Sequence, residues 1–342
     1  MQRSVLILLL VLISCQEDNI LGGNLNQEQW DIDTEFVQQG CYAGRDCIPS
    51  IDNPHYAITT DPAHTYLQES DLVVGMYNGS EYVAYPHPIL DWHEVVNESG
   101  YMISYCPLTG SALHAVTEGE FGVSGMLYNS NLIMYDRGTE SYWPQLLLAS
   151  AAGTKRGRTL ELKPLLETTW ATWRKLYPDS KVLTTETGYS RNYGSYPYGN
   201  YKTCNSASCG DYIYFSLIHF DDRLPAKERV LTIATETEQW AFPIRNSVMP
   251  TLVEKEIGGV SYRIIISAAD NLAIAFQTTR DLLIDQWDTI AGTIRLKERN
   301  SELSWDALGV SHNGGENLIA ADAFIAYWFA AAAFYPDIRL NP

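Results

Sequence analysis

Two residue types that can do chemistry stand close together in the first half of the chain. His93 occurs in D-W-H-E and Cys106 in Y-C-P-L-T-G, with twelve residues between them, so neighbouring strands can bring the two side chains together. Thiolate and imidazole groups are ligands for zinc and copper, and the two together suit copper especially well. The sequence therefore predicts a metal site, with copper the preferred ion, at Cys106 and His93, and His114 is a third candidate ligand.

The same side chains are compatible with other functions. Cys106 can be a catalytic nucleophile with His93 or His114 as its base, as in thiol hydrolases and transferases. A lone thiol in an oxidising compartment can instead exchange with a redox partner. Both residues also have a structural interpretation, because free cysteine is commonly a buried small residue and histidine commonly a satisfied core or capping residue. A non-catalytic binding or scaffold protein with a Tyr- and Trp-rich surface is the third class.

A polar stretch follows the cysteine motif and reads F-G-V-S-G-M-L-Y-N-S-N-L-I-M-Y-D-R-G-T-E-S-Y-W-P-Q. Asp136, followed by Arg137 and Gly138, indicates a turn between two strands. The other polar side chains of the stretch can line a pocket or support the ligands from outside. The predicted pocket and supporting residues are Glu94, Thr109, Tyr128, Asn129, Asp136 and Gln145.

The N-terminus has the pattern of an export signal. A cation at Arg3 precedes an apolar run at residues 5–13, followed by Ser14 and Cys15. The run is too short for a bilayer, which needs about 20 apolar residues. The ending L-I-S-C resembles a bacterial lipobox, so we expect lipidation of Cys15 and an anchor in the cell envelope. The anchored protein is then on the outer-membrane, periplasmic or surface side, where a redox or envelope protein is an expected partner.

Export also changes how the other cysteines are interpreted, because oxidising compartments favour disulfides. Cys41 with Cys47, and Cys204 with Cys209, form two close pairs and predict two local disulfides. Cys106 is left without a partner by this pairing.

The composition limits the function class. The 342 residues are 46% hydrophobic and carry 41 acidic against 23 basic side chains, a formal net charge of −18. This is enough apolar material for a core, so the chain is not disordered. The acidic balance argues against a nucleic-acid partner, because binding phosphates needs clustered Lys and Arg.

The sequence contains an internal similarity. Residues 74–116 align with residues 230–276, and four anchors keep the same order in both halves at offsets of 157 to 162 residues. The anchors pair Ala84-Tyr85-Pro86 with Ala241-Phe242-Pro243, Ala112 with Leu272, Trp143 with Trp305, and Tyr177-Pro178-Asp179 with Tyr335-Pro336-Asp337. We therefore expect a duplicated unit. Pro250 falls at the position of His93 and Ile266 at that of Cys106, so the second copy is predicted to lack the site.

Each copy is predicted to contain short strands and one closing helix. Runs rich in Tyr, Val and Ile predict strands at residues 81–85, 101–106, 230–233 and 262–267. Leu166, Trp170, Trp173 and Tyr177 recur at helical spacing after Pro164. In the second copy, Asp322 can cap a buried helix over A-F-I-A-Y-W-F-A-A-A-A-F-Y. The predicted fold is α+β and β-rich, with two pseudo-equivalent halves.

These observations divide the chain into five parts. The predicted parts are a signal peptide (1–14), a tether (15–50), a first repeat with the candidate site (51–187), a tyrosine-rich connecting loop (188–225) and a degenerate second repeat (226–342). The connecting loop, S-R-N-Y-G-S-Y-P-Y-G-N-Y, runs into Cys204. It predicts either an ordered surface loop closed by a disulfide or a tyrosine-lined lid over a site.

Several motifs resemble a known family. The sequences A-Y-P-H-P-I-L-D-W-H-E-V-V-N-E, Y-C-P-L-T-G-S-A, the polar stretch above and T-T-W-A-T-W resemble, in order, those of exported bacterial and archaeal proteins with domain of unknown function 3179. The resemblance runs from about Ile48 to the C-terminus and implies an exported protein without an established reaction. The family pattern often reads Y-C-P-L-C-G, whereas Thr109 stands at the second cysteine here. This departure argues against a dithiol and leaves mechanisms that need only Cys106.

Overall fold

The computed structural model describes residues 29–202, 212–245 and 249–341. The predicted signal peptide, Cys15 and the predicted pair Cys204 and Cys209 lie outside these residues. Within the described ranges, no helix is both long enough and apolar enough to cross a membrane.

Three sheets build the first half of the chain. The first sheet contains, in order across it, β12 (Leu166–Thr169), β3 (Leu72–Tyr77), β4 (Tyr82–Pro86), β13 (Lys181–Leu183) and β2 (Tyr56–Ile58). The second contains β11 (Glu161–Leu162), β7 (Ser111–Val116), β6 (Tyr101–Cys106) and β5 (Val95–Glu98). The third contains β1 (Val37–Gln39), β8 (Phe121–Tyr128), β9 (Asn131–Asp136) and β10 (Tyr142–Pro144). Strand β13 is parallel to β4, and the other pairs are antiparallel.

The second half has three sheets with a closely matching strand order. The first contains β23 (Ala323–Tyr327), β14 (Arg229–Ala234), β15 (Gln239–Pro243) and β24 (Arg339–Leu340), with β24 parallel to β15. The second contains β16 (Thr251–Ile257), β17 (Val260–Ser267), β18 (Leu272–Gln277) and β22 (Ile319–Ala320). The third contains β19 (Leu282–Asp288), β20 (Thr293–Glu298) and β21 (Ser304–Trp305). The prediction of a β-rich fold is confirmed.

Short helices connect these strands. The α-helices of the described residues are α2 (His87–His93), α3 (Trp170–Leu176) and α4 (Trp328–Phe334). Helix α3 joins β12 to β13, and α4 joins β23 to β24. Single turns of 3-10 helix occur at η1 (Thr34–Phe36), η2 (Pro62–His64) and η3 (Gln145–Leu147).

Both predicted closing helices are shorter than expected. Leu166 lies in strand β12, and the helix begins at Trp170 because the Thr169 hydroxyl accepts a hydrogen bond from the backbone N–H of Thr172. Asp322 does not cap a helix, since the next five residues form strand β23 and pair with β14. Strand pairing there outweighs the local helix propensity of an Ala-rich sequence. Helix α2 was not predicted.

Close contacts fix the helices on the sheets. A Cβ atom at Gly75 in β3 would lie 2.0 Å from Cζ3 of Trp173, so only glycine lets α3 pack directly on this strand. The Trp173 indole is fully buried and donates a hydrogen bond to the Ser180 hydroxyl at 2.9 Å. This packing holds the turn that leads from α3 into β13.

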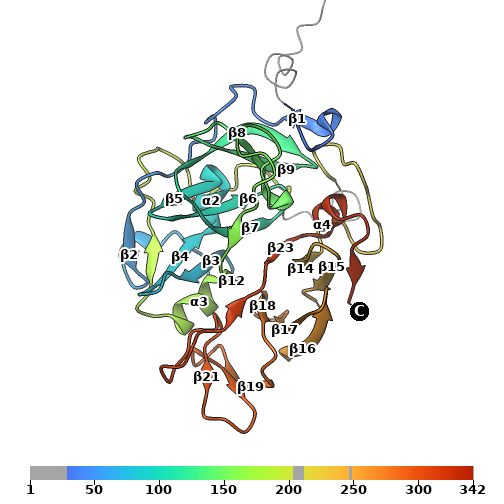
Figure 1. Ribbon diagram of the computed structural model, residues 1–342. Helices are drawn as coiled ribbons and strands as arrows, with labels where there is room; N and C mark the ends of the chain where they lie inside the picture. Colours follow the sequence, from blue (N-terminus) through green and yellow to red (C-terminus); the bar gives the residue numbers. More distant parts are fainter. Residues whose placement is uncertain (1–28, 203–211, 246–248, 342) are drawn as a thin grey trace, which may run out of the picture.

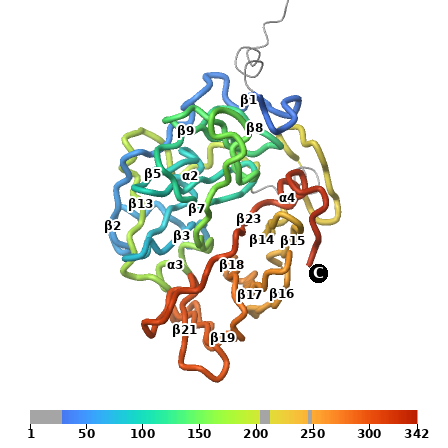
Figure 2. Tube along the Cα trace, in the orientation of Figure 1, coloured from blue at the N-terminus to red at the C-terminus, as the bar shows by residue number. Residues whose placement is uncertain are grey.

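The two halves lie side by side, blue to green and orange to red in Figure 1. Strand β23 packs against β7, and β12 packs against β18. The Cα trace in Figure 2 shows β23 running alongside the first half before the chain enters α4. At this junction the backbone N–H of Tyr327 donates to the carbonyl oxygen of Thr109 at 2.8 Å. The second half therefore contributes residues next to the cysteine motif.

Candidate functional site

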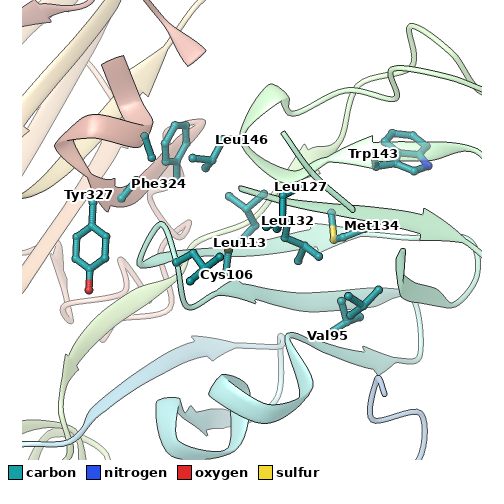
Figure 3. Close-up of a cluster of buried hydrophobic side chains, with 14 of the residues drawn as sticks. Val95, Cys106, Leu113, Leu127, Leu132, Met134, Trp143, Leu146, Phe324 and Tyr327 are labelled. Atoms are coloured by element: carbon teal, nitrogen blue, oxygen red, sulfur yellow. The ribbon is translucent and has the colours of Figure 1, made fainter. Parts of the chain in front are cut away.

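Cys106 is the last residue of strand β6 and is 1% exposed. Its side chain packs among apolar residues of both halves, including Leu113, Leu132 and Phe324 (Figure 3). The thiol donates to the carbonyl oxygen of Ser130 with a sulfur–oxygen distance of 3.9 Å. Cys106 is a free cysteine in the interior of the protein.

Burial keeps this thiol protonated. It raises the pKa of Cys106 to about 11, and the neighbouring Glu94 carboxyl group adds to the increase in its ionised form. The thiolate is the reactive and metal-binding form of cysteine. At neutral pH, Cys106 is therefore a protonated and unreactive thiol in this structure.

Glu94 owes its position to the end of helix α2. It is the C-cap residue, with φ of 58° in the left-handed region, and its N–H donates to the carbonyl oxygen of Leu90. Its carboxyl group is buried and accepts a hydrogen bond from the Tyr198 hydroxyl at 2.9 Å. Burial raises the pKa of Glu94 to about 8, the Tyr198 bond lowers it, and the charge of Asp91 adds to the rise. Glu94 is therefore mostly protonated at neutral pH.

Residues 188–202, which we call the tyrosine segment, cover helix α2 and Cys106. Five hydrogen bonds hold it: Trp92 Nε1 to Ser195 O (3.1 Å), Tyr193 OH to His93 Nε2 (2.8 Å), Tyr198 OH to Glu94 Oε1 (2.9 Å), Tyr201 OH to Leu108 O (2.9 Å) and Lys202 Nζ to Asp91 Oδ2 (2.7 Å). Three tyrosines of the segment also lie close enough to Cys106 to interact with it electrostatically: Tyr196, Tyr198 and Tyr201. The tyrosine segment is therefore an ordered wall of the candidate site.

A cavity of about 190 Å³ lies beside Glu94. Most of its lining is apolar, and its polar side-chain groups are the Glu94 carboxyl and the hydroxyls of Tyr198 and Tyr214. The lining residues come from the start of the described chain, from the C-cap of α2, from the β6–β7 turn, from the β8–β9 hairpin and from the segments around Tyr198 and Phe215. An apolar cavity with one buried carboxyl group is a typical small-molecule site.

The confirmed disulfide forms part of this cavity wall. Cys41 and Cys47 are bonded, as predicted, and Cys41 lies in the cavity lining. The backbone N–H groups of Gly40 and Cys41 both donate to the carbonyl oxygen of Gly125 in β8. Gly125 has φ of 80°, and a Cβ atom there would lie 2.6 Å from the Gly44 carbonyl oxygen. The glycine thus allows the disulfide loop to close on the β8–β9 hairpin.

His93 is held by two hydrogen bonds in a fully buried position. Its Nδ1 donates to the carbonyl oxygen of Pro49 at 2.8 Å, and its Nε2 lies 2.8 Å from the hydroxyl of Tyr193. Burial lowers the pKa of His93 to about 4, so the ring is neutral and Nε2 accepts from the tyrosine. Both ring nitrogens are therefore engaged. The geometry favours the interpretation of His93 as a satisfied core residue over a ligand or a base.

His114 lies on the other face of its sheet from Cys106. Side chains alternate along β6, with Met102, Ser104 and Cys106 on one face. His114 in β7 pairs with Ile103, which places its ring on the opposite face. There it donates from Nδ1 to the carbonyl oxygen of Pro164 at 3.1 Å. His114 and Cys106 therefore cannot bind one ion without rearrangement of the sheet.

The predicted ligand set is thus not assembled in the structure. Cys106, His93 and His114 do not meet at one point, because one histidine is fully hydrogen-bonded and the other faces away. In the part of the chain that the structure describes, no three His, Cys, Asp or Glu side chains gather as metal ligands. The group that does adjoin Cys106 is the Glu94 carboxyl.

Two predicted supporting residues lie in a hydrogen-bonded network beside Cys106. Gln145 Oε1 accepts from Ser111 at 2.6 Å and from Asn131 at 2.9 Å, and its Nε2 donates to Ser104 at 3.0 Å. Asn131 also donates to the Thr109 hydroxyl at 2.8 Å. All these side chains are buried, so the network fixes the turn after β6 and, with it, the thiol.

The other three predicted residues lie elsewhere. Asn129 occupies the β8–β9 turn, where it accepts from the N–H of Ile218 at 2.9 Å. Asp136 ends β9 and accepts from the Trp143 indole at 3.1 Å, and the predicted turn follows it. Tyr128 packs edge-on against Phe334. These contacts are structural and do not reach Cys106.

The structure also brings together charged and polar residues that the sequence did not single out. We call them the junction cluster: His87, Asp91, Glu167, Tyr196, Lys202 and Arg229. They come from α2, β12, β14 and the tyrosine segment, so both halves contribute. His87 and Asp91 are four residues apart and share one face of α2. The sequence H-P-I-L-D-W-H contains this spacing, but it places the two residues on one face only if the segment is helical, and the helix was not predicted.

The β6–β7 turn has the same length as the β17–β18 turn of the second half. Each contains four residues, with Cys106 opposite Ser111 and Ser267 opposite Leu272. Counted from these turns, the residue that aligns with Cys106 is Ser267, one position after the predicted Ile266. Its hydroxyl donates to Asp270 at 2.6 Å.

Comparison with known proteins places the chain in a family. No curated protein and no solved structure matches it. The family described as "Protein of unknown function (DUF3179)" matches residues 45–338. This range includes the whole junction cluster and every residue that lines the cavity except Gly40 and Cys41. The chain belongs to the DUF3179 family.

Proposed function

We propose that the protein is an exported binding protein whose first half holds a small, mainly apolar amine in the cavity beside Glu94. The observation that carries the proposal is the lining, in which one buried carboxyl group faces an otherwise largely apolar space. A buried carboxylate needs a charged or hydrogen-bonding partner, and an ammonium group supplies both. The Tyr198 hydroxyl already donates to Glu94, so the carboxyl group is held in place for a ligand.

The size and shape of the cavity restrict the ligand. A cavity of roughly 150 Å³ lined by apolar side chains holds benzene, so 190 Å³ accommodates one ring with a short substituent. The rings of Tyr198, Tyr214 and Phe215 in the lining favour a cation near their faces. Benzylamine is therefore a suitable probe.

Isothermal titration of the protein with benzylamine tests the proposal, with benzyl alcohol as the neutral ligand of the same shape. We expect saturable binding of the amine and at least about tenfold weaker binding of the alcohol, since a charged hydrogen bond is lost. Glu94→Gln should weaken amine binding by a similar factor. The exposed Glu161→Gln is the matched control and should bind normally. Equal affinity of Glu94→Gln and the unchanged protein would contradict the proposal.

Thiol chemistry at Cys106 is the second candidate, and the proximity of Glu94 favours it. The predicted bases were His93 and His114, but the side chain whose charge acts on the thiol is Glu94, which was predicted as a supporting residue. Attack by Cys106 on an electrophile in the cavity would pass the thiol proton to the ionised carboxylate of Glu94. Labelling of native Cys106 by iodoacetamide as fast as in the unfolded chain, or faster, would support this role. The raised pKa of the buried thiol leads us to expect slower labelling, and this is why thiol chemistry ranks second.

Export, lipidation and duplication complete the proposal. The N-terminal pattern supports a signal peptide at residues 1–14 and a lipid anchor at Cys15 in the cell envelope. Metabolic labelling with palmitate, compared between the natural chain and Cys15→Ser, tests the lipid anchor.

The matched strand orders of the two halves and the four pairs of aligned sequence segments support a duplicated unit. The second copy lacks both the thiol and the counterpart of Glu94 in D-W-H-E, so the ligand site belongs to the first.

A further inference from the structure

The junction cluster contains two ion pairs whose carboxylates are buried and whose cations are partly exposed. Lys202 Nζ lies 2.7 Å from Asp91 Oδ2, and Arg229 contacts the Oε1 oxygen of Glu167. The hydroxyl of Tyr105 interacts with the charges of both Asp91 and Glu167, so the two pairs are close to each other.

The same residues present polar atoms that make no hydrogen bond, although His87 Nε2 lies 3.7 Å from Oε1 of Glu167. The buried side-chain atoms without a hydrogen bond in this cluster are His87 Nε2, Asp91 Oδ1, Glu167 Oε2, Tyr196 OH and Arg229 Nη1. Asp91 and Glu167 are each 2% exposed and His87 is 4% exposed. Buried polar groups in folded proteins nearly always have partners, so five orphaned atoms in one cluster indicate a missing one.

The orphaned atoms define the chemistry of the partner. Asp91 and Glu167 offer free carboxylate oxygens, which accept hydrogen bonds and favour a cation, whereas Arg229 offers a free N–H that favours an anion. Burial lowers the pKa of His87 well below its usual value, so this ring is neutral. The two cations and two carboxylates of the cluster therefore balance. A ligand with a net charge would leave one buried charge uncompensated.

We infer that the junction cluster is a second binding site, for a small zwitterion that carries both an ammonium and a carboxylate group. The ammonium group lies between Asp91 and Glu167, and the carboxylate group accepts from Arg229. The side chains of Lys202 and Arg229 are 29% and 16% exposed, so solvent reaches the cluster from their side. The site differs from the cavity beside Glu94 in its residues and in its ligand.

Isothermal titration with glycine, L-alanine and L-serine tests the inference, with methylamine and acetate as the two halves of glycine. We expect at least one amino acid to bind about tenfold or more tightly than either half, because both charged contacts form only with the zwitterion. Asp91→Asn and Arg229→Lys should each weaken that binding about tenfold. Asp285→Asn, which removes a carboxylate from an exposed ion pair with Arg295, is the matched control and should leave it unchanged.

Two further measurements keep the test decisive. The near-ultraviolet circular dichroism spectrum of each variant must match that of the natural protein, which shows that the variant is folded. If Asp91→Asn does not fold, the binding measurement is made with Arg229→Lys, which keeps the positive charge. Absence of saturable binding for all three amino acids, or a crystal structure with the amino acid present that shows only water at the orphaned atoms, would overturn the inference.

Discussion

The hydroxyl group of Tyr198 donates a hydrogen bond to the carboxyl group of Glu94, 104 residues earlier in the chain, at 2.9 Å. This bond joins the tyrosine segment to the end of helix α2. It also positions the carboxyl group at the cavity and next to the Cys106 thiol. The ligand chemistry that we propose depends on this arrangement rather than on the predicted histidines.

The pH dependence of stability should change when Glu94 is replaced by glutamine. The folded pKa of Glu94, about 8, lies above the usual value of 4.5. The folded state then holds a proton that the unfolded chain loses, so this residue costs stability as pH rises from about 4.5 to 8. One pKa unit corresponds to about 1.4 kcal/mol, which makes the total roughly 3 to 5 kcal/mol. Urea unfolding should therefore show that the free energy of unfolding falls less between pH 5 and pH 9 in Glu94→Gln than in the natural protein. An equal fall in both proteins would show that the pKa of Glu94 is not raised.

Benzylamine binding should strengthen with pH. The ammonium form of the amine pairs with ionised Glu94, and ionisation becomes easier as pH approaches about 8. Alkyl amines, like the lysine side chain with a pKa near 10, stay protonated over this range. The dissociation constant should therefore fall about tenfold per pH unit between pH 5 and pH 8. Titration at four pH values measures it, and a constant affinity would show that Glu94 does not ionise on binding.

Cys106 should react slowly in the native protein. With a pKa of about 11, its thiolate fraction at pH 8 is far below that of an unfolded cysteine. Iodoacetamide labelling should therefore be at least about a hundredfold slower than in urea. Glu94→Gln removes a negative charge beside the thiol and should accelerate native labelling. Mass spectrometry of the Cys106 peptide gives both rates, and an unchanged rate in the variant would mean that Glu94 does not act on the thiol.

Replacement of His93 should affect stability rather than metal content. The pKa of His93, about 4, lies below the usual value, so its contribution is present above pH 6.5 and is lost as pH falls towards 4. His93→Gln should destabilise the protein by roughly 2 to 4 kcal/mol at pH 7 and by less at pH 4, because two buried hydrogen bonds are disturbed. Elemental analysis without chelator should give the same copper and zinc content in both proteins. Stoichiometric metal in the natural protein that the variant loses would restore the metal prediction.

The strands could be predicted from the sequence where their composition is distinctive. Residues 101–106 form β6 with the predicted bounds, because Tyr, Met and Ile alternate between two cores. Helix α2 could not be recognised in the same way, since seven residues with Pro88 in the first turn give little periodicity. The left-handed backbone conformation of Glu94, a residue of the cavity lining, has no signature in the sequence.

The candidate site was only partly predictable for the same reason. The Cys41–Cys47 disulfide was paired correctly. Glu94 was expected to support the site, and its charge does act on Cys106, but no pattern in the sequence paired these two residues. His114 could have been excluded by counting cross-strand register from the four-residue turn after β6. Lys202 reaches Asp91 across 111 residues, and Arg229 reaches Glu167 across 62. Contacts of this length depend on how the halves pack, which the local sequence does not specify.

A crystal structure of the protein grown with benzylamine would show whether Glu94 binds an amine. We expect the aromatic ring in the cavity lined by Leu108, Leu132 and Phe215, and the ammonium nitrogen about 3 Å from a carboxyl oxygen of Glu94. A cavity that contains only water, or a benzylamine molecule whose nitrogen points away from Glu94, would contradict the proposal.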